Sequence, residues 1–500
     1  MRLPLIGGSY VARSRIANAQ RCVNYFPEIN REDSPVPLTY YQRPGLRQLV
    51  QDGANINPVR CIYRASNGQG FAVIGVKVYY VSSGFVLTHL GDLTVFGTGP
   101  CRMIDNGTTI LLVDGSTFGY TIVLATHAFA QINDPTGSFN GANTVGFLDT
   151  FVVWNEPGTI DFGSTLSNSL TFDALYFAGK IGYPDPLQAL SVNRREILLL
   201  GALKSEIWYN SGGATFPFAI LPGVYIEQGC AATYSVGTID IETIWLSRDL
   251  RGHGMIVSLK AYNLKRISNH ALELAIQKMP NISDAFAYTY QIEGHSFYVI
   301  TFPSGNQTWA CDMSLVEKPE LAWHQRCWTD ANGGLNRERL MSHAFLYGKN
   351  VGGDWQNGKI YELDQDYYFD DASGVGLDPI TCIKGFPHNF QGIDPLVGGM
   401  APSDNRRMIY RNFQADIEVG DIPLNSDGST PQVTLRVSRD RGKTFDTVGL
   451  QSMGNPGQYE TAPQWLNLGL ARDMVFELSH SLPGPAALNG AWVQCEVNAS

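Results

Sequence analysis

The eight cysteines of the chain are scattered over 500 residues, and none stands in a Cys-x-x-Cys pair. Such spacing favours neither a zinc site nor a dense disulfide framework, so we expect reduced, buried thiols. The N-terminus has no apolar run of signal-peptide length, and no window approaches the ~18 apolar residues that a membrane span needs. These absences predict no membrane insertion and a protein made in the cytoplasm.

Motifs of enzyme active sites are missing as well. The sequence contains no HExxH, no GxSxG, no phosphate-binding loop and no GxGxxG after an apolar strand. None of its nine histidines stands at metal-ligand spacing from another His or Cys. We therefore expect no enzyme, no catalytic residue, no cofactor and no resident metal.

Charged side chains are few, at 16% of the residues, and 36 basic against 46 acidic groups give a formal charge of −10. A net negative chain gains little from releasing the counterions of DNA, so bulk binding to duplex DNA is not expected. The 52 glycines and 26 prolines, with 44% hydrophobic residues, fit a turn-rich β protein better than a helical one.

What the sequence does contain is a recurring hairpin. Phe71–Val81 places apolar runs on both sides of Gly75 and predicts two paired strands. Further apolar runs follow at intervals of roughly 40 to 50 residues, the period of propeller blades. They are centred near Leu112, Val153, Leu199, Trp245, Tyr298 and Phe345. This pattern predicts an all-β fold with a β-propeller over residues 51–375, of about seven blades with six as the alternative.

Local signals refine this expectation. Asp114-Gly115 and Glu156-Pro157-Gly158 predict tight turns inside two of the hairpins. One helix is expected within Arg266–Met279, with Ser268 or Asn269 as its N-cap.

The hairpin period ends near residue 375, and residues 376–500 are predicted to form a C-terminal β-sandwich, while residues 1–50 form an N-terminal strap and a first strand. Apolar and polar residues alternate in a stretch within Gln432–Phe445, as they do in a half-buried strand. It ends in a pattern that resembles an Asp-box, a structural hairpin turn. The residues of this motif are Ser438, Asp440, Gly442, Thr444 and Phe445.

An acidic stretch precedes the boundary. Its carboxylates could bind calcium, or they could be edge charges that discourage further strand pairing, and the spacing does not match an EF-hand loop. The residues are Glu362, Asp364, Asp366, Asp370 and Asp371.

The first 27 residues are basic and contain no carboxylate, since Glu28 is the first. Either this segment docks onto an acidic partner or DNA, or it folds along its own acidic domain. The candidate docking residues are Arg2, Arg13, Arg15 and Arg21.

Several phrases resemble the packaged-DNA stabilisation proteins of short-tailed phages, which are tail-hub or head-completion proteins. The likeness extends over most of the chain, including the C-terminal phrases. The phrases are QRCVNYFPE (20–28), RPGL (43–46), EILLLG (196–201), EIWY (206–209), EQGCAATY (227–234), IWLSRD (244–249), TLRVSRDRGKTF (434–445) and NLGLARDMVFEL (467–478).

The resemblance implies a structural virion protein of the tail or neck, with a propeller-like body in a hexameric ring of identical copies. Its partners would be the portal adaptor ring above and the tail fibre or spike and needle proteins below, with DNA passing through the channel without sequence-specific binding. The alternative is a carbohydrate-active propeller, because sialidases combine a propeller with Asp-boxes. Such a glycosidase would need an Arg cluster and paired acids.

Overall fold

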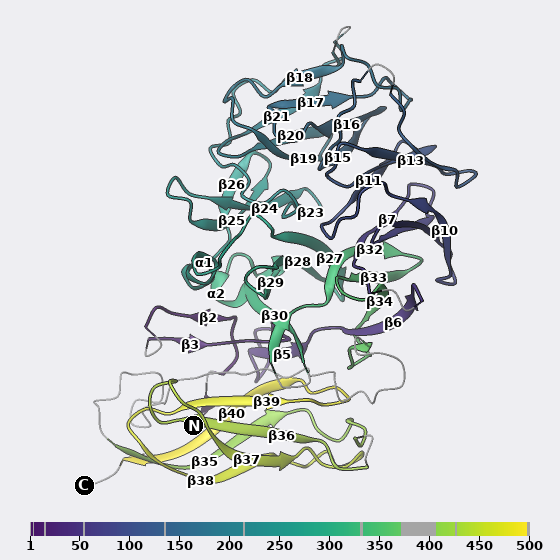
Figure 1. The fold of residues 1–500 in the computed structure, drawn as a ribbon. Helices are drawn as coiled ribbons and strands as arrows, with labels where there is room; N and C mark the ends of the chain where they lie inside the picture. The colour runs from purple at the N-terminus through teal and green to yellow at the C-terminus, as the bar shows by residue number, and fades with distance from the viewer. Residues whose placement is uncertain are drawn as a thin grey trace.

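The computed structural model describes residues 2–3, 5–14, 17–53, 56–134, 137–213, 216–330, 334–371, 407–425 and 428–497. Strands dominate these residues, and they form a ring of small sheets next to a two-sheet sandwich (Figure 1). The predicted fold class is thereby confirmed: the protein is all-β, with a β-propeller followed by a C-terminal β-sandwich.

Seven blades make up the ring in the described part of the chain, which agrees with the expected count of about seven. Neighbouring blades contact each other in sequence order, and the ring closes where β32 of the last blade contacts β7 of the first. The strands of the seven blades are β7 to β10 (Val59–Arg64, Gly70–Ile74, Lys77–Val81, Leu87–Asp92); β11 to β14 (Arg102–Asp105, Thr109–Val113, Gly119–Val123, Phe129–Gln131); β15 to β18 (Val145–Leu148, Phe151–Asn155, Asp161–Ser164, Phe177–Gly179); β19 to β22 (Leu187–Asn193, Glu196–Gly201, Ser205–Asn210, Phe218–Ile220); β23 to β26 (Gly237–Ile239, Glu242–Arg248, Gly254–Lys260, Asn263–Arg266); β27 to β31 (Phe286–Ile292, His295–Phe302, Gln307–Asp312, Trp323–Thr329, Leu335–Arg337); and β32 to β34 (Leu340–Leu346, Lys349–Asp354, Lys359–Asp364) with β6 (Gly45–Gln51).

Burial on both faces explains why the blades read as apolar runs rather than as alternating strands. Each junction between neighbouring blades in the ring has its own cluster of buried apolar side chains. The second strand of a blade therefore contacts one cluster on each face, and strands such as β8, β12 and β20 are buried along most of their length. The Phe71–Val81 hairpin is the β8–β9 pair, with Gly75 at a φ of 61° in its turn.

The seventh blade departs from the apolar pattern. Phe345, at the centre of the run predicted there, lies on β32, the first strand of this blade, and is 52% exposed. The second strand, β33, instead contains Gly352 and Gly353, where a Cβ would collide with the side chains of Leu340 and Val59. Glycine is needed here because the neighbouring side chains approach the backbone closely.

The blade turns and the helix follow the local signals. Asp114-Gly115 separates β12 from β13, and Glu156-Pro157-Gly158 separates β16 from β17. Helix α1 covers His270–Gln277, and its N-cap Asn269 accepts a hydrogen bond from the Leu272 amide. A short helix α2 (Pro319–Ala322) and a 3₁₀ turn η1 (Met313–Leu315) lie between β29 and β30.

The sandwich combines both ends of the chain. Its larger sheet has the order β38-β35-β40-β5-β4, with β1 on β40, and its smaller sheet has the order β37-β36-β39. One apolar cluster, which includes Val433, Phe476 and Leu488, fills the space between them. The strands are β1 (Arg2–Leu3), β4 (Tyr25–Ile29), β5 (Leu38–Gln42), β35 (Met408–Ile417), β36 (Gln432–Ser438), β37 (Asp446–Ser452), β38 (Gln464–Ala471), β39 (Val475–His480) and β40 (Leu488–Val497).

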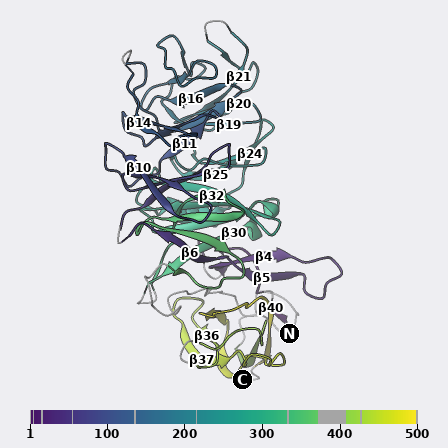
Figure 2. The ribbon, with the colours of Figure 1, turned by 90° about the vertical axis from the view of Figure 1, so that its right-hand side faces the viewer.

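Residues 1–50, which we expected to form a strap and a first strand, divide between both domains. Strands β1, β4 and β5 belong to the sandwich, whereas β6 pairs with β34 and completes the seventh blade. A two-stranded sheet, β2 (Tyr10–Val11) with β3 (Ala19–Gln20), extends beside α1. Figure 2 shows β4 and β5 between the propeller and the rest of the sandwich.

The cysteines of the described residues are free thiols, six of them buried and Cys495 partly buried, as the spacing predicts. Cys382 lies outside the described residues. Neither α1 nor α2 has the length of a membrane-spanning helix, and the described residues contain no other α-helix.

Candidate functional site

The segment that joins the two domains is held by backbone and side-chain hydrogen bonds centred on Asn24. Its amide donates to the Gln325 carbonyl over 2.9 Å, and its side chain both donates to the Cys327 carbonyl (3.0 Å) and accepts from the Cys327 amide (2.9 Å). Asn24 has a φ of 58°, a conformation that Asn tolerates better than most residues. The QRCVNYFPE phrase therefore fastens the sandwich to blade six.

Ionisable groups lie around the same joint, and most of them are buried. Arg43 forms a two-pronged ion pair with Asp370, and the side chains of both are at most 2% exposed. His295 lies 2.7 Å from Asp312 and 3.3 Å from Glu28, and the hydrogen bond to Asp312 raises the pKa of His295. Glu28 belongs to the sandwich sheet and the other two to blade six, so this group links the domains directly.

Two of the four candidate docking arginines are turned toward their own chain. Arg2 donates to the carbonyls of Pro35 and Asn489, each over 2.9 Å, and Arg21 donates to the Gln325 side chain over 2.6 Å. Arg15 lies outside the described residues. For Arg2 and Arg21, the geometry corresponds to the alternative in which the segment folds along its own domain.

Arg13 is different, because it is exposed in the loop between β2 and β3. The start of this segment is anchored to α2 and β30, where the Gly8 amide donates to the Glu320 carbonyl over 3.1 Å and the Ser9 amide donates to the Trp323 carbonyl. Helix α1 contacts β2 from the side. The hairpin thus holds Arg13 at a fixed place next to the propeller.

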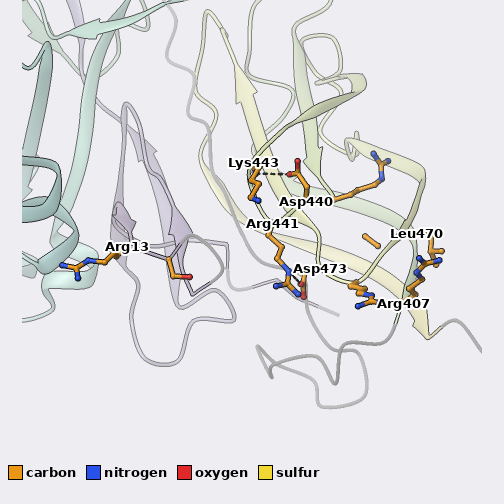
Figure 3. A pocket seen from close by; sticks show the side chains of 11 residues that line it. Arg13, Arg407, Asp440, Arg441, Lys443, Leu470 and Asp473 are labelled. Carbon is orange, nitrogen blue, oxygen red and sulfur yellow. Dashed lines mark hydrogen bonds and ion pairs between the residues drawn. The ribbon is translucent and has the colours of Figure 1, made fainter. Parts of the chain in front are cut away.

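A pocket of about 980 Å³ lies between this hairpin and the edge of the sandwich (Figure 3). We call it the basic pocket, because six of its side chains are cationic and two are acidic. The charged residues that line it are Arg13, Arg407, Arg439, Arg441, Lys443 and Arg472, with Asp440 and Asp473. Our sequence reasoning marked only Arg13 as a site residue among these cations.

The Asp-box residues shape one wall of the basic pocket. The Gly442 amide donates to Ser438 Oγ over 2.8 Å, the Thr444 amide donates to Asp440 Oδ1 over 2.8 Å, and Thr444 Oγ1 donates to Asp440 Oδ2 over 2.6 Å. These bonds, with that of the Thr444 hydroxyl foremost, hold the pKa of Asp440 well below its usual range. Phe445 is half-buried, with the Arg436 guanidinium 5.6 Å from its ring centre.

This turn presents three of the cations that sequence reasoning missed. Arg439, Arg441 and Lys443 alternate around Asp440 and Gly442, which take part in the bonds that fix the turn. The alternation was visible in the sequence as Arg-x-Arg-x-Lys, but its meeting with Arg13, more than 420 positions earlier in the numbering, was not.

The acidic stretch does not converge on a single point. Glu362 pairs with Lys349 (2.6 Å), Asp364 with Arg47 (2.6 Å) and Asp370 with Arg43. The Asp371 carboxylate accepts a hydrogen bond from the Gln48 amide (2.8 Å). The Asp366 amide donates a hydrogen bond to the Asp364 carboxylate (3.0 Å). Within the described ranges, no group of three or more His, Cys, Asp or Glu side chains is arranged to hold a metal ion. These carboxylates mostly fasten β34 and the following turn to neighbouring strands.

The fold and these contacts define a class: a β-propeller protein whose N-terminal segment ties it to a second β domain. The family model described as bacteriophage P22 Gp10, beta-propeller, matches residues 1–368, and the chain belongs to this family. The resemblance seen in the sequence is thereby confirmed, and the protein is a phage structural propeller.

No curated protein sequence matches the chain. Among solved structures, the WD40 propeller domain of Doa1 is 12% identical, with 65% of this chain and 98% of that chain covered and a TM-score of 0.37. The RRP9 WD40 repeats are 10% identical, with 65% and 99% covered and a TM-score of 0.41. BamB from Moraxella catarrhalis is 9% identical, with 61% and 83% covered and a TM-score of 0.38. Similarities this low carry no argument about function, and the comparisons do not support the glycosidase alternative.

Proposed function

We propose that the chain is a tail-hub protein of a short-tailed phage, which assembles below the portal and its adaptor ring and closes the DNA-filled head. The observation that carries this proposal is the family match over residues 1–368. In this role the chain forms a hexameric ring of identical copies in the neck of the virion. The ring carries tail fibres or spikes and a needle, and it opens to let DNA leave.

The contacts inside the chain support a load-bearing role without catalysis. The propeller ring is closed by a strand from the N-terminal segment, and the same segment supplies β1, β4 and β5 to the sandwich. Pulling the sandwich away from the propeller would require breaking the hydrogen bonds from Asn24 to Gln325 and Cys327 and the contact between Glu28 and His295. A hub that connects a head to a tail needs this kind of resistance.

The charge of the chain supports passage of DNA rather than retention by tight binding. Strong binding to duplex DNA is driven by cationic side chains that displace the counterions of the phosphates, and a chain with a formal charge of −10 gains little from this release. A ring of such chains would let DNA slide past its wall.

A phage that lacks this gene tests the proposal. We expect filled heads that lose their DNA, measured as nuclease-sensitive genomes in purified particles, and recovery when the wild-type chain is added to the particles. Mutant particles that keep their DNA and remain infectious would contradict the proposed function.

A further inference from the structure

The basic pocket holds more positive charge than its own carboxylates neutralise. Arg441 Nε lies 2.8 Å from Asp473 Oδ2, and Arg439 Nη1 lies 3.0 Å from Asp446 Oδ2, so these two arginines are paired. Arg13, Arg407 and Lys443 have no ion pair with any residue that the structure describes, and all three are exposed. On a chain with a formal charge of −10, this concentration of free cations is unusual.

The cations around the turn are also held in place before any partner arrives. Arg441 and Gly442 adopt φ values of 64° and 80°, and the bonds from Thr444 and Gly442 to the Asp-box side chains fix that conformation. Arg439 additionally donates to the Leu468 carbonyl over 2.7 Å. A preorganised group of cations loses less entropy on binding than one on a free loop.

Shape distinguishes between the two kinds of anionic partner. The basic pocket is a hollow of about 980 Å³ between two parts of the molecule, whereas duplex DNA is a convex rod that needs an extended basic surface. Asp440 and Asp473 also line the hollow, and they would repel a continuous phosphate backbone. A peptide segment can enter a hollow and place its carboxylates beside the free cations only.

We propose that the basic pocket docks an acidic, glutamate- or aspartate-rich segment of another protein. The identification of that protein as a component of the phage tail rests on the proposed function, but the binding chemistry does not. The hairpin that carries Arg13 forms the propeller side of the basic pocket, and Arg407 and Lys443 line its sandwich side, so the bound segment bridges the two domains.

Binding to the purified full-length chain tests the inference. The probe is a fluorescein-labelled 12-residue peptide with six glutamates, followed by fluorescence anisotropy at low and at high salt. We expect binding that weakens as salt rises. The double variant Arg407→Glu/Lys443→Glu should lower the affinity about tenfold or more, which corresponds to about 1.4 kcal/mol. The variant Arg407→Gln/Lys443→Gln removes the charges without adding carboxylates and should lower it less.

The matched control is Arg64→Glu/Lys260→Glu, which makes the same change in net charge at exposed positions of two blades outside the basic pocket. It should bind the peptide nearly as the wild-type chain does. Circular dichroism and the thermal unfolding midpoint establish that each variant is folded.

Three results would overturn the inference: no binding of the peptide, equal losses in the pocket and control variants, or tighter binding of a 20-base-pair duplex than of the peptide. Tighter binding of the duplex would indicate that the basic pocket binds the phosphates of DNA instead of a peptide. Peptide binding by a chain that turns out not to be in the tail would contradict the proposed function alone.

Discussion

The blades and the joint between the domains are built in opposite ways. Blades one to six each consist of strands that follow one another in the chain, and their interfaces are apolar. The joint brings together residues more than 300 positions apart, as Asn24 with Cys327 and Arg43 with Asp370, and it buries charged groups. The propeller is thus a local, repetitive scaffold, whereas the joint is a long-range polar connection.

This difference teaches where the molecule is sensitive to single changes. A large apolar interface tolerates many substitutions of similar volume, since its contacts are numerous and weak individually. A buried ion pair loses its compensation as soon as one partner is removed. We therefore expect the largest effects at the joint.

Arg43→Ala should destabilise the protein by about 3–5 kcal/mol, because it leaves the Asp370 carboxylate buried without its partner. The free energy of unfolding in a denaturant titration measures this effect. Arg31→Ala is the matched control, since the Arg31 and Asp33 side chains are 86% and 68% exposed, and its cost should stay below about 0.5 kcal/mol. An equal loss in the free energy of unfolding for the two variants would contradict the expectation that the joint is more sensitive than the surface.

Gly45→Ala tests the seventh blade, whose fourth strand, β6, comes from the N-terminal segment. A Cβ at Gly45 would collide with the carbonyl oxygens of Tyr367 and Phe369, at the start of the closing strand β6. We expect a loss of about 1–3 kcal/mol from this overpacking, measured as a lower thermal unfolding midpoint. Gly99→Ala has open space around its Cβ and should change the midpoint little. An unchanged unfolding midpoint for Gly45→Ala would mean that ring closure does not depend on the close approach of Gly45 to these carbonyl oxygens.

The pH dependence should be the smallest of the three effects. Because the pKa of His295 is raised in the folded state, its contribution to stability is full below the ordinary value of about 6.5. That contribution is lost as the pH rises through the raised pKa. The stability difference between wild type and His295→Gln should therefore be larger near about pH 6 than near about pH 9.

The control for this measurement is His89→Gln, since His89 and Asp92 form an exposed pair on blade one. The buried His324 acts with the opposite sign, because burial lowers its pKa and its contribution is lost as the pH falls. A pH-independent difference for His295→Gln would show that the charge of His295 does not hold the joint.

The blades could be predicted from the sequence because their information is local. A run such as Ile110–Val113 followed by Asp114-Gly115 specifies a strand and its turn without reference to distant residues. The seventh blade was harder, since its second strand uses Gly352 and Gly353 in place of large apolar residues.

The basic pocket and the joint could be predicted only in part, because both depend on contacts between distant segments. The excess of arginine before Glu28 was visible, but nothing local indicated that Arg2 and Arg21 turn inward while Arg13 stays exposed. The buried pairing of Arg43 with Asp370 was likewise hidden, and the acidic stretch invited a calcium interpretation.

Reconstruction of the phage particle tests the central claim most directly, with this chain located by a bound antibody fragment. We expect seven-bladed rings, each with its sandwich, arranged around the channel immediately below the portal and its adaptor. Location of the chain in the capsid shell, at a fibre tip, or nowhere in the mature particle would contradict the account.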